Sequence, residues 1–99
     1  MPISEEIIKK VAEDTGIKME ELTKLGLLAI LREKRRDIMI ERLEVLKKYN
    51  VNSSKELREK IERGEIKEHP GWEEFILLEN LEGTLEIIER DIEVIQESS

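Results

Sequence analysis

Residues 19–49 read MEELTKLGLLAILREKRRDIMIERLEVLKKY, and this stretch decides the fold. It holds no proline and one glycine, and it consists mainly of Leu, Ile, Glu, Lys and Arg, which favour an α-helix. At a rise of 1.5 Å per residue such a helix is about 45 Å long, which exceeds the width of a small globular domain. The stretch therefore predicts a single long helix against which the rest of the chain packs.

The apolar residues of this helix fall into two segments separated by charge. Residues 25–31, LGLLAIL, are apolar on every face of a helix, so they need cover from more than one side. Residues 32–37, REKRRD, are all charged, and residues 38–49 are amphipathic again. A second copy of the chain is the simplest cover for the first segment. The predicted homodimer interface consists of Leu27, Leu28, Ile30 and Leu31.

Signals for two short helices flank the long one. Ser4 is a predicted N-cap with two glutamates behind it, and Gly16 is a predicted C-terminal stop. These signals place an N-terminal helix within residues 1–18. After the long helix, Ser53 opens a Ser-Ser-Lys-Glu capping box, which predicts a short helix over residues 53–63.

Residues 70–97 form the last predicted helix and show the most regular apolar spacing in the chain. Steps of three and four separate its large apolar residues, as in a coiled-coil or bundle contact. These residues are Leu78, Leu81, Leu85, Ile88, Ile92 and Ile95. Because residues 53–63 are too few to do more than reverse the chain, the two long helices are expected to form an antiparallel hairpin. In an antiparallel hairpin, the numbers of two residues that lie opposite each other have a constant sum. If Tyr49 lies opposite Trp72, this sum is about 121.

The predicted fold class is all-α: a long-helix antiparallel hairpin, like a helical bundle or coiled coil, with two short helices. Residues 1–99 are expected to be one domain that dimerises. Charged residues make up 41% of the chain and aromatic residues only 3%, a balance typical of solvated helices around an aliphatic seam. Disorder is the competing interpretation of so charged a chain, and the regular apolar spacing argues against it.

The acidic charge is concentrated in the last third of the chain. Residues 1–63 carry a net charge of +2 and residues 64–99 a net charge of −9, which together give −7. A row of glutamates on the last helix should repel one another, so we expect a basic surface to face them. Trp72 either closes the hairpin over Tyr49 or anchors a partner. The predicted partner-binding residues are Trp72, Glu79, Glu82, Glu86, Glu89 and Glu93.

The basic residues of the long helix have two interpretations. They pair with the glutamate row inside the hairpin, or they contact phosphates and make the protein a weak nucleic-acid binder. The candidate phosphate contacts are Arg32, Lys34, Arg35 and Arg36. A net charge of −7 makes nucleic acid the less favoured partner, because phosphate contacts supply much of the affinity in such complexes.

The sequence predicts a non-enzymatic protein without cofactor or metal. It has no cysteine, a single histidine and no glycine-rich phosphate loop. Glu65 and His69 come nearest to a metal-binding pair, and no second pair accompanies them. With no secretory signal and no apolar run of about 20 residues, the protein is expected in the cytoplasm and not in a membrane.

Residues 4–34, SEEIIKKVAEDTGIKMEELTKLGLLAILREK, resemble the two helices of ribbon-helix-helix antitoxins. In that family a DNA-reading strand precedes the helices, whereas here only residues 1–3 do. The resemblance therefore implies dimerisation through helices rather than DNA binding. The whole chain, with EHPGWE at residues 68–73, also resembles small archaeal helical proteins of toxin–antitoxin type. That resemblance implies a small basic toxin as partner.

These observations predict a protein-binding module, antitoxin-like, whose acidic last helix covers a basic partner. One alternative is a self-associating structural or regulatory adaptor without a toxin partner. A second alternative is nucleic-acid binding through the basic residues of the segment 32–36.

Overall fold

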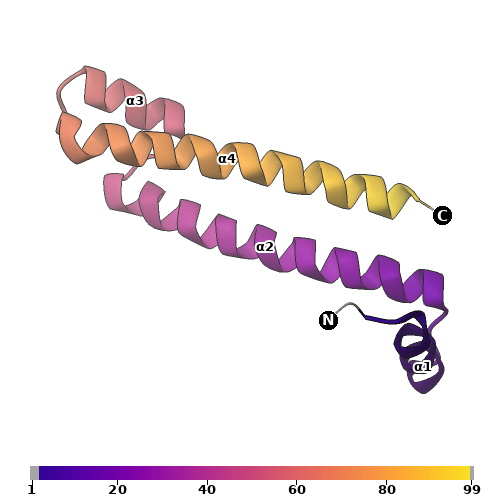
Figure 1. Cartoon of the computed structure of the whole chain (residues 1–99). Helices are drawn as coiled ribbons and strands as arrows, with labels where there is room; N and C mark the ends of the chain where they lie inside the picture. The colour runs from indigo at the N-terminus through magenta and orange to yellow at the C-terminus, as the bar shows by residue number, and fades with distance from the viewer. Residues whose placement is uncertain (1–2, 99) are drawn as a thin grey trace.

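The computed structural model describes residues 3–98, and this part of the chain contains helices and no strand (Figure 1). The four helices are α1 (Glu5–Thr15), α2 (Met19–Tyr49), α3 (Ser54–Glu62) and α4 (Glu68–Glu97). Helices α2 and α4 run antiparallel along a molecule that measures 61 × 29 × 18 Å. The predicted all-α fold with a long antiparallel hairpin is confirmed.

Local capping explains where the helices begin and end. The Ser4 hydroxyl accepts a hydrogen bond from the Ile7 amide at 3.3 Å, and Gly16 ends α1 with a left-handed φ of 72°. The Ser53 hydroxyl caps α3 by accepting from the Glu56 amide at 3.1 Å. The Glu56 carboxylate accepts from the Asn52 amide rather than from that of Ser53, so the capping box closes one residue earlier than expected.

The start of α4 is pressed against the end of α3. His69 and Pro70 have non-helical backbone angles, so the regular part of α4 begins at Gly71, one residue after the predicted start at residue 70. A Cβ atom added to Gly71 would lie only 3.2 Å from two side-chain carbons of Ile61 and 3.4 Å from Ile66 Cγ2. Glycine therefore permits the close approach of the two helices.

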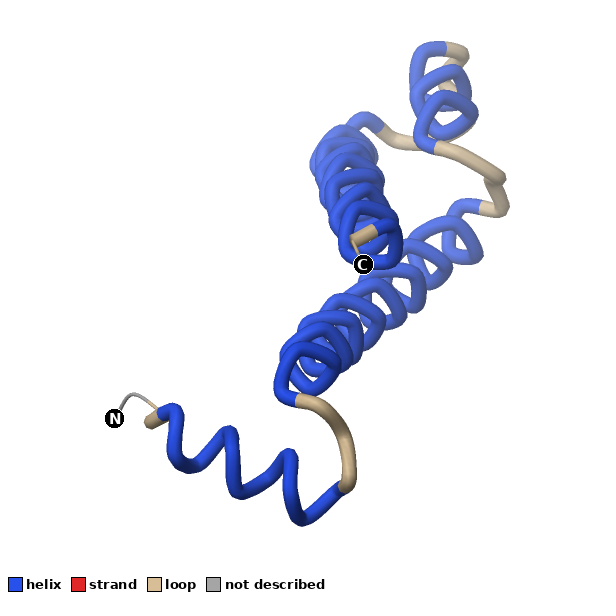
Figure 2. The backbone as a smooth tube through the Cα atoms, turned by 90° about the vertical axis from the view of Figure 1, so that its right-hand side faces the viewer, coloured by secondary structure: helices blue, strands red, loops and turns tan. Residues whose placement is uncertain are grey.

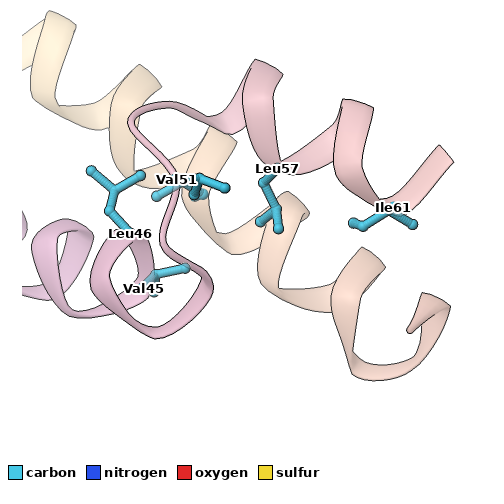
Figure 3. Close-up of a cluster of buried hydrophobic side chains, with 6 residues drawn as sticks. Val45, Leu46, Val51, Leu57 and Ile61 are labelled. Atoms are coloured by element: carbon cyan, nitrogen blue, oxygen red, sulfur yellow. The ribbon is translucent and has the colours of Figure 1, made fainter. Parts of the chain in front are cut away.

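The closed end of the hairpin contains the first of two apolar clusters. Figure 3 shows side chains from the end of α2, from the following turn and from α3 pointing toward one another. Leu57 and Leu78 are fully buried in this cluster. Its buried members are Val45, Leu46, Val51, Leu57, Ile61 and Leu78. Tyr49, Ile66, Trp72 and Phe75 pack around them.

The second cluster fills the hairpin along the rest of α2 and α4. It is built from the predicted α4 seam and from one face of α2. Its buried members are Leu28, Ile38, Leu81, Ile88 and Ile92, with Leu31, Leu85 and Ile95 packed against them. All six residues of the predicted seam thus lie in one of the two clusters, and each is buried or half-buried.

Three contacts between the long helices fix their register. The Lys48 ammonium lies 2.7 Å from the Glu74 carboxylate, and Arg42 Nε lies 3.1 Å from Glu82 Oε1. At the other end, Lys24 Nζ donates to the Ser98 carbonyl at 2.9 Å. The paired numbers add up to 122, 124 and 122, within three residues of the predicted value.

Helix α1 stands away from the hairpin rather than lying along it. Figure 2 shows it leaving the N-terminal end of α2, while α3 lies at the opposite end. Only Ala12 of α1 is buried, and the side chains of Ile7 and Val11 are 53% and 41% exposed. Of the apolar segment 25–31, Leu25, Leu27 and Ile30 accordingly remain exposed.

The predicted dimer interface is corrected in part. Leu28 is 5% exposed and Leu31 is half-buried, because both pack against the α4 seam inside the hairpin. These two side chains therefore do not offer a surface to a second copy. Leu27 and Ile30 remain exposed, by 49% and 67%.

Candidate functional site

The glutamate row of α4 divides into two parts that have different surroundings. Glu82 and Glu89 lie seven residues apart next to the apolar seam, and Glu82 is half-buried while Glu89 is exposed. The Glu82 carboxylate binds Arg42 through one oxygen and accepts from the Ser54 hydroxyl at 2.8 Å through the other. Glu82 thus pairs with a basic residue of the long helix inside the hairpin, which is one of the two interpretations of the basic residues given by the sequence.

Glu79, Glu86 and Glu93 form the second part of the row and are exposed on the outer side of α4. Their spacing of seven residues places them on one stripe of the helix. Glu86 lies 3.8 Å from Arg90 of its own helix, a weak solvent-exposed pair. Among residues 3–98, Glu79 and Glu93 form no ion pair. This stripe is therefore excess negative charge that the hairpin does not use.

Large apolar side chains lie beside this stripe on the same outer side of α4. Ile76, Ile87 and Val94 are 55%, 58% and 57% exposed. Gly83 lies between them, and a Cβ atom added there would have no heavy atom within 4 Å, so its surroundings are open. We call this surface the α4 outer face. It consists of Ile76, Glu79, Gly83, Glu86, Ile87, Glu93 and Val94.

The arginines of α2 line a groove on the side of the hairpin. The groove has a volume of about 570 Å³ and combines cationic with apolar walls. Its lining consists of Arg32, Arg35, Arg36, Met39, Ile40, Arg42, Leu43 and Leu85. Lys34 is not part of the lining, so the predicted set of phosphate contacts is divided between two flanks of α2. Among the described residues, Arg32, Arg35 and Arg36 form no ion pair.

Trp72 has a structural role at the closed end. Its ring is half-buried and meets the Phe75 ring edge-on, with centroids 5.7 Å apart and planes at 84°. Tyr49 packs on the same cluster, where burial and the nearby Glu74 carboxylate raise its pKa. A hydrogen bond to Glu74 likewise raises the pKa of Lys48. We therefore leave Trp72 out of the α4 outer face.

The only histidine lies at the start of α4 and is exposed. Its Nδ1 atom lies 2.8 Å from the Glu73 carboxylate. A backbone amide at the helix start and the His69 ring lower the pKa of Glu73. Within the described residues, no three His, Asp or Glu side chains come together as a metal site. The same residues contain no helix that is long and apolar enough to span a membrane.

Sequence reasoning found the acidic row but not its apolar neighbours. The sequence predicted a role only for the apolar residues of the α4 seam. It assigned no role to the other Ile and Val residues of α4. Their signal was present, because Ile76 and Gly83 lie seven residues apart, as do Ile87 and Val94. The contact of Gly71 with Ile61 has no signal in the sequence, since it depends on the tertiary fold.

Comparison with known proteins assigns the chain to a family. The model of the family described as "Uncharacterized protein MJ0235 family" matches residues 1–98, so the chain belongs to that family. It is 37% identical over 68 residues to Uncharacterized protein MJ0235 of Methanocaldococcus jannaschii. The aligned stretch covers 69% of this chain and 83% of that protein. No solved structure matches the chain. The archaeal relationship is thus confirmed, while the toxin–antitoxin resemblance stays a prediction.

Proposed function

We propose that this member of the MJ0235 family is a non-enzymatic protein-binding module whose α4 outer face binds a basic surface of another protein. The observation that carries the proposal is the placement of three exposed aliphatic side chains directly beside a glutamate stripe. Among the described residues, the only ion pair of this stripe is the weak one between Glu86 and Arg90. The aliphatic side chains would supply affinity by being buried, and the glutamates would supply selectivity for a basic partner. Charge of one sign on one face also raises the rate of association with an oppositely charged surface.

A second copy of the chain fits the α4 outer face poorly. Two such faces packed antiparallel would place Ile76 of one copy opposite Val94 of the other. The same arrangement would bring the glutamate stripes together, with Glu86 beside its own counterpart. Like charges at such positions destabilise a helix pair, so the face selects a cationic partner instead.

The finer form of the proposal is that the protein acts as an antitoxin-like partner of a small basic toxin-like protein. Two observations support it: the resemblance of residues 4–34 to antitoxin helices and the net charge of −9 on residues 64–99. An acidic helix that covers the cationic surface of a small protein would block the access of that surface to nucleic acid.

The test compares two matched baits in a cell extract of the source organism. One bait carries Glu79→Lys, Glu86→Lys and Glu93→Lys on the α4 outer face. The control carries the same change of charge on exposed glutamates elsewhere, at Glu13, Glu20 and Glu44. We expect a basic protein that the wild type and the control both enrich and that the outer-face variant loses. Quantitative mass spectrometry of the captured proteins provides the measurement.

The salt dependence of association and the helix content of the variants complete the test. The purified partner should associate more slowly as salt rises, because screening weakens the steering by the glutamates. Circular dichroism should show the same helix content for both variants. If no captured protein distinguishes the outer-face variant from the control, the α4 outer face is not a binding site and the proposal is wrong.

A further inference from the structure

Helix α2 carries a second row of residues with coiled-coil spacing, separate from the face that packs on α4. Its members follow one another in steps of three and four residues over most of the helix. They are Leu22, Leu25, Ala29, Arg32, Arg36, Met39, Leu43 and Leu46. We call this row the α2 side seam. Four of its residues, Arg32, Arg36, Met39 and Leu43, line the groove described above.

The middle of the α2 side seam is open while its ends are covered. Leu46 is 8% exposed because it belongs to the closed-end cluster, and Leu22 is half-buried near α1. Between them, Leu25, Met39 and Leu43 are 46%, 51% and 50% exposed. At 1.5 Å per residue, the segment from Leu25 to Leu43 is about 27 Å long. A row of that length with heptad spacing, apolar at both ends and cationic at its centre, is suited to helix–helix packing.

The α2 side seam is complementary to itself when two copies run antiparallel. Leu25 then faces Leu43 of the second copy, and Ala29 faces Met39, a small residue opposite a large one. Arg32 faces Arg36, and the numbers of every pair add up to the same value, 68. A row that pairs with its own reverse is what a two-fold symmetric interface requires.

The arginines at the centre of this arrangement have acidic groups close by. Among residues 3–98, neither Arg32 nor Arg36 forms an ion pair. Glu33 lies on α2 beside the seam, and by the hairpin register Glu89 of α4 lies at the same level. With Arg35, which lines the same groove, two copies would bring six arginines and four of these glutamates to the symmetry axis. The glutamates there offset most of the positive charge, whereas the α4 outer face has Arg90 beside three glutamates.

We propose that the α2 side seam is the interface of an antiparallel homodimer, with the symmetry axis near residue 34. The second copy fills the groove of about 570 Å³ and covers Met39 and Leu43. This interface does not depend on the proposed function, because α4 keeps its outer face free. It also replaces the interface expected from the sequence, since Leu27 and Ile30 lie on the opposite flank of α2.

Cysteine cross-linking tests the proposal directly, because the natural chain contains no cysteine. Single variants Ala29→Cys and Met39→Cys are prepared, together with the double variant. A short thiol-reactive cross-linker is added to the full-length protein at a concentration where the wild type sediments as a dimer. We expect at least about tenfold more covalent dimer from the double variant, or from a mixture of the two singles, than from either single variant alone.

The alternatives give different patterns. Efficient cross-linking of Met39→Cys alone would mean a parallel pair and would overturn the proposal. Leu27→Cys and Ile30→Cys serve as controls on the opposite flank, and their preferential cross-linking would move the interface there. A wild-type protein that sediments as a monomer at high micromolar concentration would also overturn it. Circular dichroism of each variant shows whether the fold is retained, and the mixture of singles repeats the test if the double variant misfolds.

Discussion

At the scale of single residues, the glycines of this chain have different roles that the sequence alone does not separate. Gly16 and Gly64 adopt positive φ angles just after α1 and α3, and the sequence predicted Gly16 as a helix stop. Gly71 instead admits Ile61 into close contact, and nothing local indicates this. The contact follows from how α3 folds back on α4, which is decided by packing rather than by local sequence preference.

Replacing Gly71 by alanine is expected to destabilise the protein. The new methyl group would lie 3.2 Å from Ile61 carbons in a tightly packed cluster, and such overpacking costs about 1–3 kcal/mol. Gly26→Ala is the matched control, because the space around Gly26 in α2 is open and alanine is the better helix former by about 1 kcal/mol. Urea unfolding measures both changes. Equal effects of the two substitutions would show that the closed end is loosely packed.

At the scale of helices, the sequence predicted the four elements and the hairpin register, because caps and heptad spacing are local signals. It did not predict the position of α1, which depends on how the short connection between Thr15 and Met19 directs the chain. It also missed the α2 side seam, because Arg32 and Arg36 interrupt a row that is otherwise apolar. A row that includes charged residues can be identified as a helix contact only when the structure shows which side of the helix it occupies.

The register of the hairpin makes a measurable prediction at Arg42 and Glu82. Both side chains are 30% exposed, and the Ser54 hydroxyl holds the second oxygen of the carboxylate. We expect a coupling of about 1 kcal/mol in a double-mutant cycle of Arg42→Met and Glu82→Gln, the upper end for pairs near the surface. The exposed pair Arg58 and Glu62 should couple by only about 0.3–0.5 kcal/mol. A coupling near zero for Arg42 and Glu82 would argue against this register.

At the scale of the whole molecule, the hairpin leaves two surfaces on different helices. Negative charge on α4 exceeds what the hairpin uses, because Glu79 and Glu93 form no ion pair among the described residues. The sequence assigned Leu28 and Leu31 to a dimer interface, whereas both pack inside the hairpin, because their direction depends on where α4 lies. We propose two separate uses of these surfaces: a second copy on α2 and a basic partner on α4.

The most direct test of these two separate uses is sedimentation of three proteins under identical conditions. The proteins are the wild type, a Leu43→Glu variant of the α2 side seam, and the Lys variant of Glu79, Glu86 and Glu93. A carboxylate buried in an apolar contact is costly, so Leu43→Glu should raise the dimer dissociation constant by at least about tenfold. The wild type and the α4 variant should both sediment as dimers. Dissociation of the α4 variant together with an intact Leu43→Glu dimer would contradict the account.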